Sequence, residues 1–266
     1  MKRAIKLILI YLGFQILFSI PAGIIIFIDT MKNGEANPSL TNTIIAITML
    51  LSSLVMSWFL WKYKYVTTEG NNFKLPSLKF ALIILCLTFG LIVILDWLSH
   101  LFPLPDMMSD IFQGMSRNVW GIIVICLVGP IMEELLFRGA IQGYMMKIYK
   151  KPSNAILLSA LIFGVIHGNP AQIPFAFLIG LVMGALYYRT GSLMPGIIIH
   201  VVNNSISTLL TAIYPDASTL FDIVGVSNGY IMLTVSVIIA AGAWYMVTKV
   251  YPAPKMEENK NISDPL

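Results

Sequence analysis

Residues 119–147 read VWGIIVICLVGPIMEELLFRGAIQGYMMK, an apolar stretch of membrane-spanning length that carries two glutamates and one arginine. A charged side chain at the centre of a spanning helix costs roughly 2.5 to 3.5 kcal/mol, so Glu133, Glu134 and Arg138 together cost on the order of 8 to 10 kcal/mol in lipid. Ionisable residues inside spans face the protein interior, pair with one another and mark functional sites. The stretch therefore predicts a helix with a buried polar site.

The composition around this helix is that of a membrane protein. Of the 266 residues, 57% are hydrophobic and 11% are charged, and the mean hydropathy is +0.81. A soluble domain of this length carries more polar residues than this. Apolar runs of about 20 residues predict an all-α, polytopic integral membrane protein with about eight transmembrane helices. They lie at 5–28, 41–61, 79–98, 119–147, 153–169, 172–189, 192–213 and 230–250.

The basic residues predict the orientation of the spans. Lys and Arg gather at both ends of the chain and in every second loop, as at Lys2, Lys62, Lys147, Arg189 and Lys249. Cytoplasmic loops are enriched in Lys and Arg, so both termini are predicted to be cytoplasmic, in a bacterial-type plasma membrane. This topology explains the net charge of +4, and no patch of basic and aromatic residues indicates nucleic-acid binding.

The spans and loops predict four parts of the chain. Residues 1–117 hold the first three transmembrane helices, 118–213 a catalytic core, 214–251 the last transmembrane helix and 252–266 a disordered cytoplasmic tail. Residues 1–22 could also be a cleaved signal peptide, but the apolar run continues to Ile28, which favours a retained first span. Residues 103–116 predict either an interfacial helix or an ordinary surface connector.

The first polar group lies in the fourth span. Glu134 and Arg138 are four residues apart and share one helix face, so they can neutralise each other. Glu133 is turned about 100° away from Glu134. It is therefore expected to be the unpaired carboxylate.

Two further polar groups lie at similar depths in other spans. Phe163 and His167 share one face of the fifth span, and His200 and Asn204 share one face of the seventh. A rise of about 1.5 Å per residue places Glu133 and His167 about 21 Å, and His200 about 14 Å, from the basic ends of their helices. Groups from three helices thus occupy overlapping levels, which predicts a single buried polar chamber.

Three motifs, in this order, resemble those of the CAAX prenyl endopeptidase and bacteriocin-processing family (CPBP, or Abi) of intramembrane proteases. The motifs are Glu133-Glu134-x-x-x-Arg138-Gly139, Phe163-x-x-x-His167 and His200-x-x-x-Asn204. The resemblance covers roughly residues 118–213. It implies an intramembrane endopeptidase that hydrolyses a peptide bond of a membrane-associated peptide or lipidated protein.

Peptide hydrolysis needs an activated water, stabilisation of the oxyanion and protonation of the leaving amine. Glu133 is expected to be the base, because Arg138 already engages its neighbour. His167 is expected to orient the water, and His200 and Asn204 to donate hydrogen bonds to the oxyanion. Glu134 is expected to assist.

By the same resemblance, Arg138 and Phe163 support the catalytic residues. The cofactor stays open between none and a divalent metal such as zinc. Glu133, His167 and His200 form a ligand set that zinc accepts, but the His-Glu-x-x-His helix of zincins is absent. The same residues could also run the chemistry without metal.

Two other classes of function use the same residues. An ion- or proton-coupled transporter could use Glu133, Glu134 and the histidines as a relay. Such a transporter is expected to have two related halves, and the sequence shows no second copy of the motif. The other alternative is a non-catalytic membrane protein that acts in bacteriocin immunity or as a scaffold.

Overall fold

The computed structural model of the protein describes residues 2–67 and 72–254, and within these ranges all regular structure is helical. Seven helices in this part of the chain are long and apolar enough to cross a membrane, which confirms the all-α, polytopic prediction. They are α1 (Lys2–Asn33), α2 (Pro38–Lys62), α3 (Leu78–Leu101), a composite helix (Val119–Ile148), α9 (Ile173–Thr190), α10 (Met194–Ile213) and α12 (Val226–Val250). The predicted tail lies outside the described residues from position 255 onward.

The fifth predicted span, 153–169, is a shorter helix. It forms α8 (Pro152–Ile166), whose 15 residues are too few for a full crossing at 1.5 Å per residue. Gly168, which has a φ of +64°, and the proline at position 170 end the helical run. His167 therefore lies at the end of a helix and not within one.

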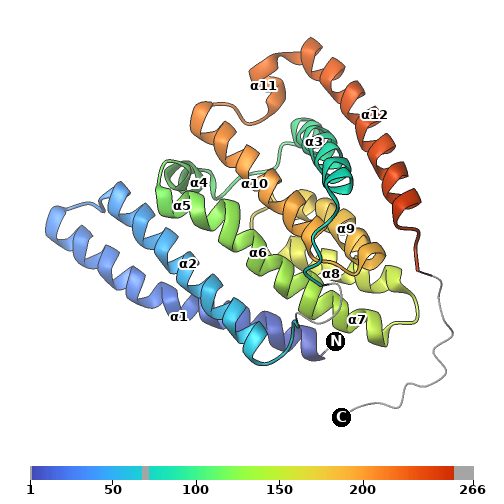
Figure 1. The fold of residues 1–266 in the computed structure, drawn as a ribbon. Helices are drawn as coiled ribbons and strands as arrows, with labels where there is room; N and C mark the ends of the chain where they lie inside the picture. Colours follow the sequence, from blue (N-terminus) through green and yellow to red (C-terminus); the bar gives the residue numbers. More distant parts are fainter. Residues whose placement is uncertain (1, 68–71, 255–266) are drawn as a thin grey trace.

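The composite helix, here named the central helix, runs diagonally through the molecule in Figure 1. Its parts are α5 (Val119–Ile123), the π-helical η1 (Val124–Val128), α6 (Gly129–Glu134), the π-helical η2 (Leu135–Gln142) and α7 (Gly143–Ile148). The two π-helical segments lie on either side of the Glu133-Glu134 pair. Wider turns of this kind are frequent at functional sites.

Pro130 accounts for part of this irregularity. In η1 the main-chain N–H of Gly129 donates to the carbonyl of Val124, five residues earlier. The carbonyl of Ile125 would pair in the same way with residue 130, but proline has no N–H. The sequence thus leaves the carbonyl of Ile125 without a main-chain donor, and the side chain of Asn204 donates to it instead.

The other helices enclose the central helix. The α1–α2 hairpin lies on one side of it, and α3 packs against α12 on the other (Figure 1). Helices α8 and α9 form an antiparallel pair, and α10 contacts both η1 and α6. A Cβ at Gly164 of α8 would lie 2.7 Å from the carbonyl oxygen of Ile173 in α9. The small residue is therefore needed for this close approach, as in other membrane helix pairs.

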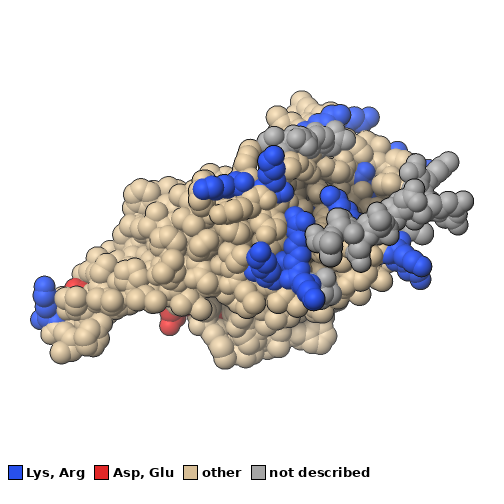
Figure 2. All heavy atoms as spheres, turned by 90° about the horizontal axis from the view of Figure 1, so that it is seen from below, with Lys and Arg blue, Asp and Glu red and all other residues tan. Residues whose placement is uncertain are grey.

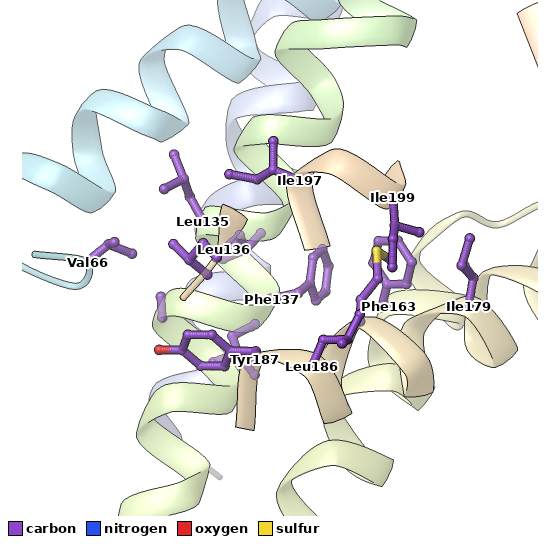
Figure 3. Close-up of a cluster of buried hydrophobic side chains, with 14 of the residues drawn as sticks. Val66, Leu135, Leu136, Phe137, Phe163, Ile179, Leu186, Tyr187, Ile197 and Ile199 are labelled. Carbon is purple, nitrogen blue, oxygen red and sulfur yellow. The ribbon is translucent and has the colours of Figure 1, made fainter. Parts of the chain in front are cut away.

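The apolar core surrounds the middle of the central helix. Phe137 of η2 and Phe163 of α8 are both 1% exposed or less, and their rings meet edge to face with centroids 5.1 Å apart. Figure 3 shows them among buried side chains from the central helix, α8, α9 and α10, with Val66 reaching in from the loop after α2. This packing holds fixed the backbone that carries the polar residues.

Two short helices lie between the spans. Within the predicted segment 103–116, only α4 (Ser109–Ser116) is helical, and residues 103–108 form an irregular strap before it. Helix α11 (Leu220–Val224) begins with a capping box between Thr219 and Asp222. The segment 103–116 is thus part connector and part helix.

Both described ends of the chain lie at the same end of the molecule (Figure 1). Seen from that side, Lys and Arg side chains gather over this end, and few acidic side chains are visible (Figure 2). A basic face is the expected pattern for the cytoplasmic side of a membrane protein. The assignment of this end to the cytoplasm stays a prediction.

Candidate active site

Glu134 and Arg138 form a buried ion pair. Arg138 Nη1 lies 2.7 Å from Glu134 Oε1, and the side chains are 1% and 0% exposed. The guanidinium also lies over the Phe163 ring, 4.3 Å from its centroid, and Arg138 Nη2 donates to the carbonyl of Gly180 at 3.3 Å. The pairing expected from the four-residue spacing is present, and it anchors the central helix to α8 and α9.

His200 of α10 reaches both glutamates. Its Nδ1 lies 3.2 Å from Glu134 Oε1, and its Nε2 lies 3.7 Å from Glu133 Oε2. An ionised carboxylate can only accept, so Nδ1–H donates to Glu134. The contact to Glu133 is longer than a hydrogen bond. Glu134 therefore accepts from two partners and positions the imidazole in front of Glu133.

Glu133 is the glutamate that solvent can reach. Each glutamate has an Oε2 that is buried without a hydrogen-bond partner, but the Glu133 side chain is 21% exposed, against 0% for Glu134. A buried carboxylate oxygen without a donor is costly in a folded protein. Such an atom can accept a hydrogen bond from a water molecule or a substrate.

His167 has a defined tautomer. Its Nδ1 lies 2.7 Å from the main-chain carbonyl oxygen of Phe163. A carbonyl oxygen cannot donate, so Nδ1 carries the hydrogen, and in the neutral ring Nε2 is left as an acceptor. The Phe163 ring meets His167 and His200 edge to face, with centroids 4.9 and 5.6 Å apart. Phe163 thus spaces the two imidazoles.

Asn204 contacts the central helix. Its Nδ2 donates to the carbonyl of Ile125 at 3.0 Å, the carbonyl that Pro130 leaves without a main-chain donor. The side chain of Asn203 donates to Asn204 Oδ1 at 3.2 Å. These two contacts orient the Asn204 amide, and neither uses its second hydrogen.

Two residues that were not predicted also border the site. A Cβ at Gly196 would lie 2.7 Å from Glu134 Oε2, so only glycine allows α10 to approach the glutamate this closely. Tyr11 of α1 lies close enough to Glu133 to interact with its charge, and it interacts with the side chain of Gln15. The sequence signal for Tyr11 is its pairing with Gln15, one turn away, in a largely apolar span.

The metal alternative does not fit this geometry. In the described part of the chain, no three His, Cys, Asp or Glu side chains are grouped so that they could hold a metal ion. The candidate ligands Glu133, His167 and His200 are among the described residues that form no such group.

Comparison with known proteins agrees with the resemblance seen in the motifs. Residues 115–206 match the family described as "Type II CAAX prenyl endopeptidase Rce1-like". Over 103 residues the chain is 33% identical to "Putative membrane peptidase YdiL" of Bacillus subtilis (strain 168); this alignment covers 38% of this chain and 40% of the relative. Over 103 residues it is also 30% identical to "Membrane-embedded CAAX protease MroQ" of Staphylococcus aureus (strain USA300), covering 36% and 41%.

The match is confined to one part of the molecule. The chain spans about two fifths of the length of these curated relatives, and no solved structure gives a significant match. The matched residues 115–206 run from the end of α4 into α10 and include every motif residue from Glu133 to Asn204.

Proposed function

We propose that this chain, whose residues 115–206 match the Rce1-like CAAX prenyl endopeptidase family, is an intramembrane endopeptidase in which Glu133 activates a water molecule. One observation carries the proposal. Glu133 Oε2 is buried without a hydrogen-bond partner, in front of an imidazole that its neighbour Glu134 holds in place. A carboxylate with free acceptor capacity beside a positioned histidine is suited to general base catalysis.

The two glutamates take different roles. Glu134 is fully buried and accepts from Arg138 and His200, so its task is to hold the guanidinium and the imidazole. Glu133 is partly exposed, and its contact to His200 is longer than a hydrogen bond. The proton removed from water thus goes to Glu133, and the hydroxyl oxygen bonds to the peptide carbonyl carbon.

The charges of the cluster balance if one proton is present. Glu133, Glu134 and Arg138 sum to one negative charge, which is costly in a low-dielectric interior. When Glu133 takes the proton of water, the cluster becomes neutral. Glu133 then returns this proton to the leaving amine when the carbon–nitrogen bond breaks, so that the atoms of hydrolysis balance.

The remaining polar atoms have complementary tasks. His167 Nε2 is an acceptor because Nδ1–H is committed to Phe163, so it suits the orientation of the attacking water. The second amide hydrogen of Asn204 is free to donate to the oxyanion. His200 donates to Glu134 through Nδ1, so it reaches an oxyanion only through a protonated Nε2. Removing one oxyanion donor typically costs about 10²- to 10³-fold in rate.

The substrate we propose is a membrane-associated peptide or lipidated protein. The name of one relative includes CAAX protease, and the site lies among apolar helices. We further propose that 118–213 is the catalytic core, that 1–117 and 214–251 frame it, and that the basic end with both termini faces the cytoplasm of a plasma membrane. A substrate then approaches within the bilayer.

A comparison of new peptide termini by mass spectrometry tests this function without a guessed substrate. Membranes are compared that contain wild type, Glu133→Gln or His200→Ala protein at matched abundance. Glu35→Gln, a change in the exposed loop after α1, is the control. The proposal expects termini that occur only with wild type and the control.

If all four profiles coincide under conditions where the protein is needed, proteolysis is the wrong assignment. Transport through the buried carboxylates, or a scaffold role in bacteriocin immunity, then explains the site better.

A further inference from the structure

Asn169 fastens the end of α8 to the strap before α4. Its side chain is fully buried and makes two hydrogen bonds to that strap. Asn169 Nδ2 donates to Asp106 Oδ1 at 2.8 Å, and the main-chain N–H of Met107 donates to Asn169 Oδ1 at 3.1 Å. Asp106 Oδ1 also accepts from the main-chain N–H of Met108 at 2.9 Å. The amide of Asn169 thus closes a ring of contacts between two loops more than sixty residues apart in sequence.

This ring is placed where the chain needs support. Helix α8 ends at Ile166, and His167 is its C-terminal cap. Gly168 follows in the left-handed conformation, and a Cβ there would meet no atom within 4 Å. At Gly168 the turn is restrained by a main-chain hydrogen bond, from its N–H to the carbonyl of Val165 at 3.1 Å, and the next residue, Asn169, is anchored through its side chain.

Asn169 also sets the start of the next helix. Its main-chain carbonyl accepts from Gln172 at 2.8 Å and from Ile173, the first residue of α9, at 3.0 Å. One residue thus joins His167, the strap and α9. A shift of Asn169 is transmitted to His167 over only two residues.

We propose that Asn169 is a positioning residue for His167, and that the strap around Asp106 is part of the frame of the active site. This role rests on the proposed function, because His167 is the residue that orients the water there. The strap precedes the family match, which begins at residue 115. The site therefore depends on a segment that the matched part of the chain does not contain.

The test combines two measurements on the full chain in detergent or nanodiscs. The first is hydrogen exchange of the peptide spanning 163–172, which needs no substrate. The second is the kcat and KM for a peptide found by the terminus comparison above. The variants are Asn169→Ala and Asp106→Ala, with Asp106→Asn as the conservative change, because its side-chain oxygen still accepts.

Met107→Ala is the matched control. Met107 contributes its main-chain N–H, and its side chain is 72% exposed, so the change leaves the ring of contacts in place. Asp106 lies on the surface, so its substitution tests the same ring without altering the buried core if Asn169→Ala fails to fold.

Asn169→Ala and Asp106→Ala are expected to speed exchange around His167 while the other helices keep their protection. They are expected to lower kcat by about 10- to 100-fold with little change in KM, because a displacement of a catalytic group by about 1 Å lowers the rate on this scale. Asp106→Asn and Met107→Ala should resemble wild type.

Unchanged exchange of the 163–172 peptide in both alanine variants would overturn the positioning role, whatever the activity. Faster exchange with unchanged kcat would also overturn it. A wild-type protein that cleaves no peptide refutes the proposed function instead, and the exchange result shows separately whether the ring holds His167.

Discussion

Replacing Arg138 by Met tests the buried ion pair that organises the site. In the wild type the guanidinium is 1% exposed, lies 2.7 Å from Glu134 and covers one face of Phe163. Methionine retains apolar volume but leaves the fully buried Glu134 with His200 as its remaining partner. Breaking a buried pair by removing one member costs about 3 to 5 kcal/mol, because the other charge is left uncompensated.

The magnitude can be separated from a loss of packing by a second substitution. In Glu134→Gln/Arg138→Met both charges are gone, while the glutamine oxygen can still accept from His200 Nδ1. The double variant should therefore be more stable than the sum of the two single effects predicts, as expected for residues in contact.

Equilibrium unfolding in mixed detergent micelles measures both effects. Arg138→Met is expected to lower the folding equilibrium constant by about 10² to 10⁴, which corresponds to the 3 to 5 kcal/mol above. A loss below about 1 kcal/mol, the range of an exposed pair, would refute the argument. The argument would also be refuted if the loss of stability in the double variant equalled the sum of the losses in the two single variants.

Three further predictions concern other parts of the structure. Gly196→Ala should destabilise the protein by about 1 to 3 kcal/mol and lower its activity, because the new methyl group meets Glu134 Oε2. The control is Gly242→Ala, where a Cβ has no atom within 4 Å. Equal unfolding midpoints of the two variants would contradict the prediction. Removal of divalent metals with a chelator should leave the cleavage rate unchanged, because the residues of the site do not form a metal-ligand group; a lost rate that zinc restores would show that the site rearranges around a metal. Burial raises the pKa of Asp222, but hydrogen bonds from Thr219 and Ser218 outweigh it and keep this pKa below its usual value. Because the pKa is lower in the folded state, the stabilisation of α11 is present above the unfolded pKa and is lost as the pH falls through the folded pKa. The protection factors of residues 218–226 against hydrogen exchange should therefore fall at acidic pH in wild type but not in Asp222→Asn, and equal pH profiles of protection would contradict this.

Much of the fold could be predicted because lipid imposes simple constraints. Spans must be apolar over about 20 residues, so hydropathy located the long helices to within a few residues, as for 79–98 and α3. For 153–169 it also located the helix but placed its end three residues past Ile166, because hydropathy does not register the end of a helix within an apolar run. The break at Gly168 depends on backbone conformation.

Local contacts of the site could also be predicted, whereas contacts between helices could not. The pairing of Glu134 with Arg138 follows from helical spacing alone. The contact of Asn204 with Ile125 depends on how α10 packs against η1. No spacing rule identifies Asn204 as the partner of the carbonyl that Pro130 leaves without a main-chain donor.

The contact between Asp106 and Asn169 could not be predicted from the sequence at all. Both residues are polar and lie in loops, where such side chains are common and usually bind water. Only the three-dimensional arrangement brings them together, two residues after His167.

The central claim is hydrolysis of a peptide bond by water that Glu133 activates. It is tested most directly with the purified chain in nanodiscs and a substrate peptide in ¹⁸O-labelled water, with the products weighed by mass spectrometry. Wild type and Glu35→Gln are expected to place one ¹⁸O atom in the new carboxyl terminus, and Glu133→Gln should be slower by about 10²- to 10⁴-fold. A purified wild type that leaves the peptide intact, or a Glu133→Gln variant that cleaves it at the wild-type rate, would contradict the account.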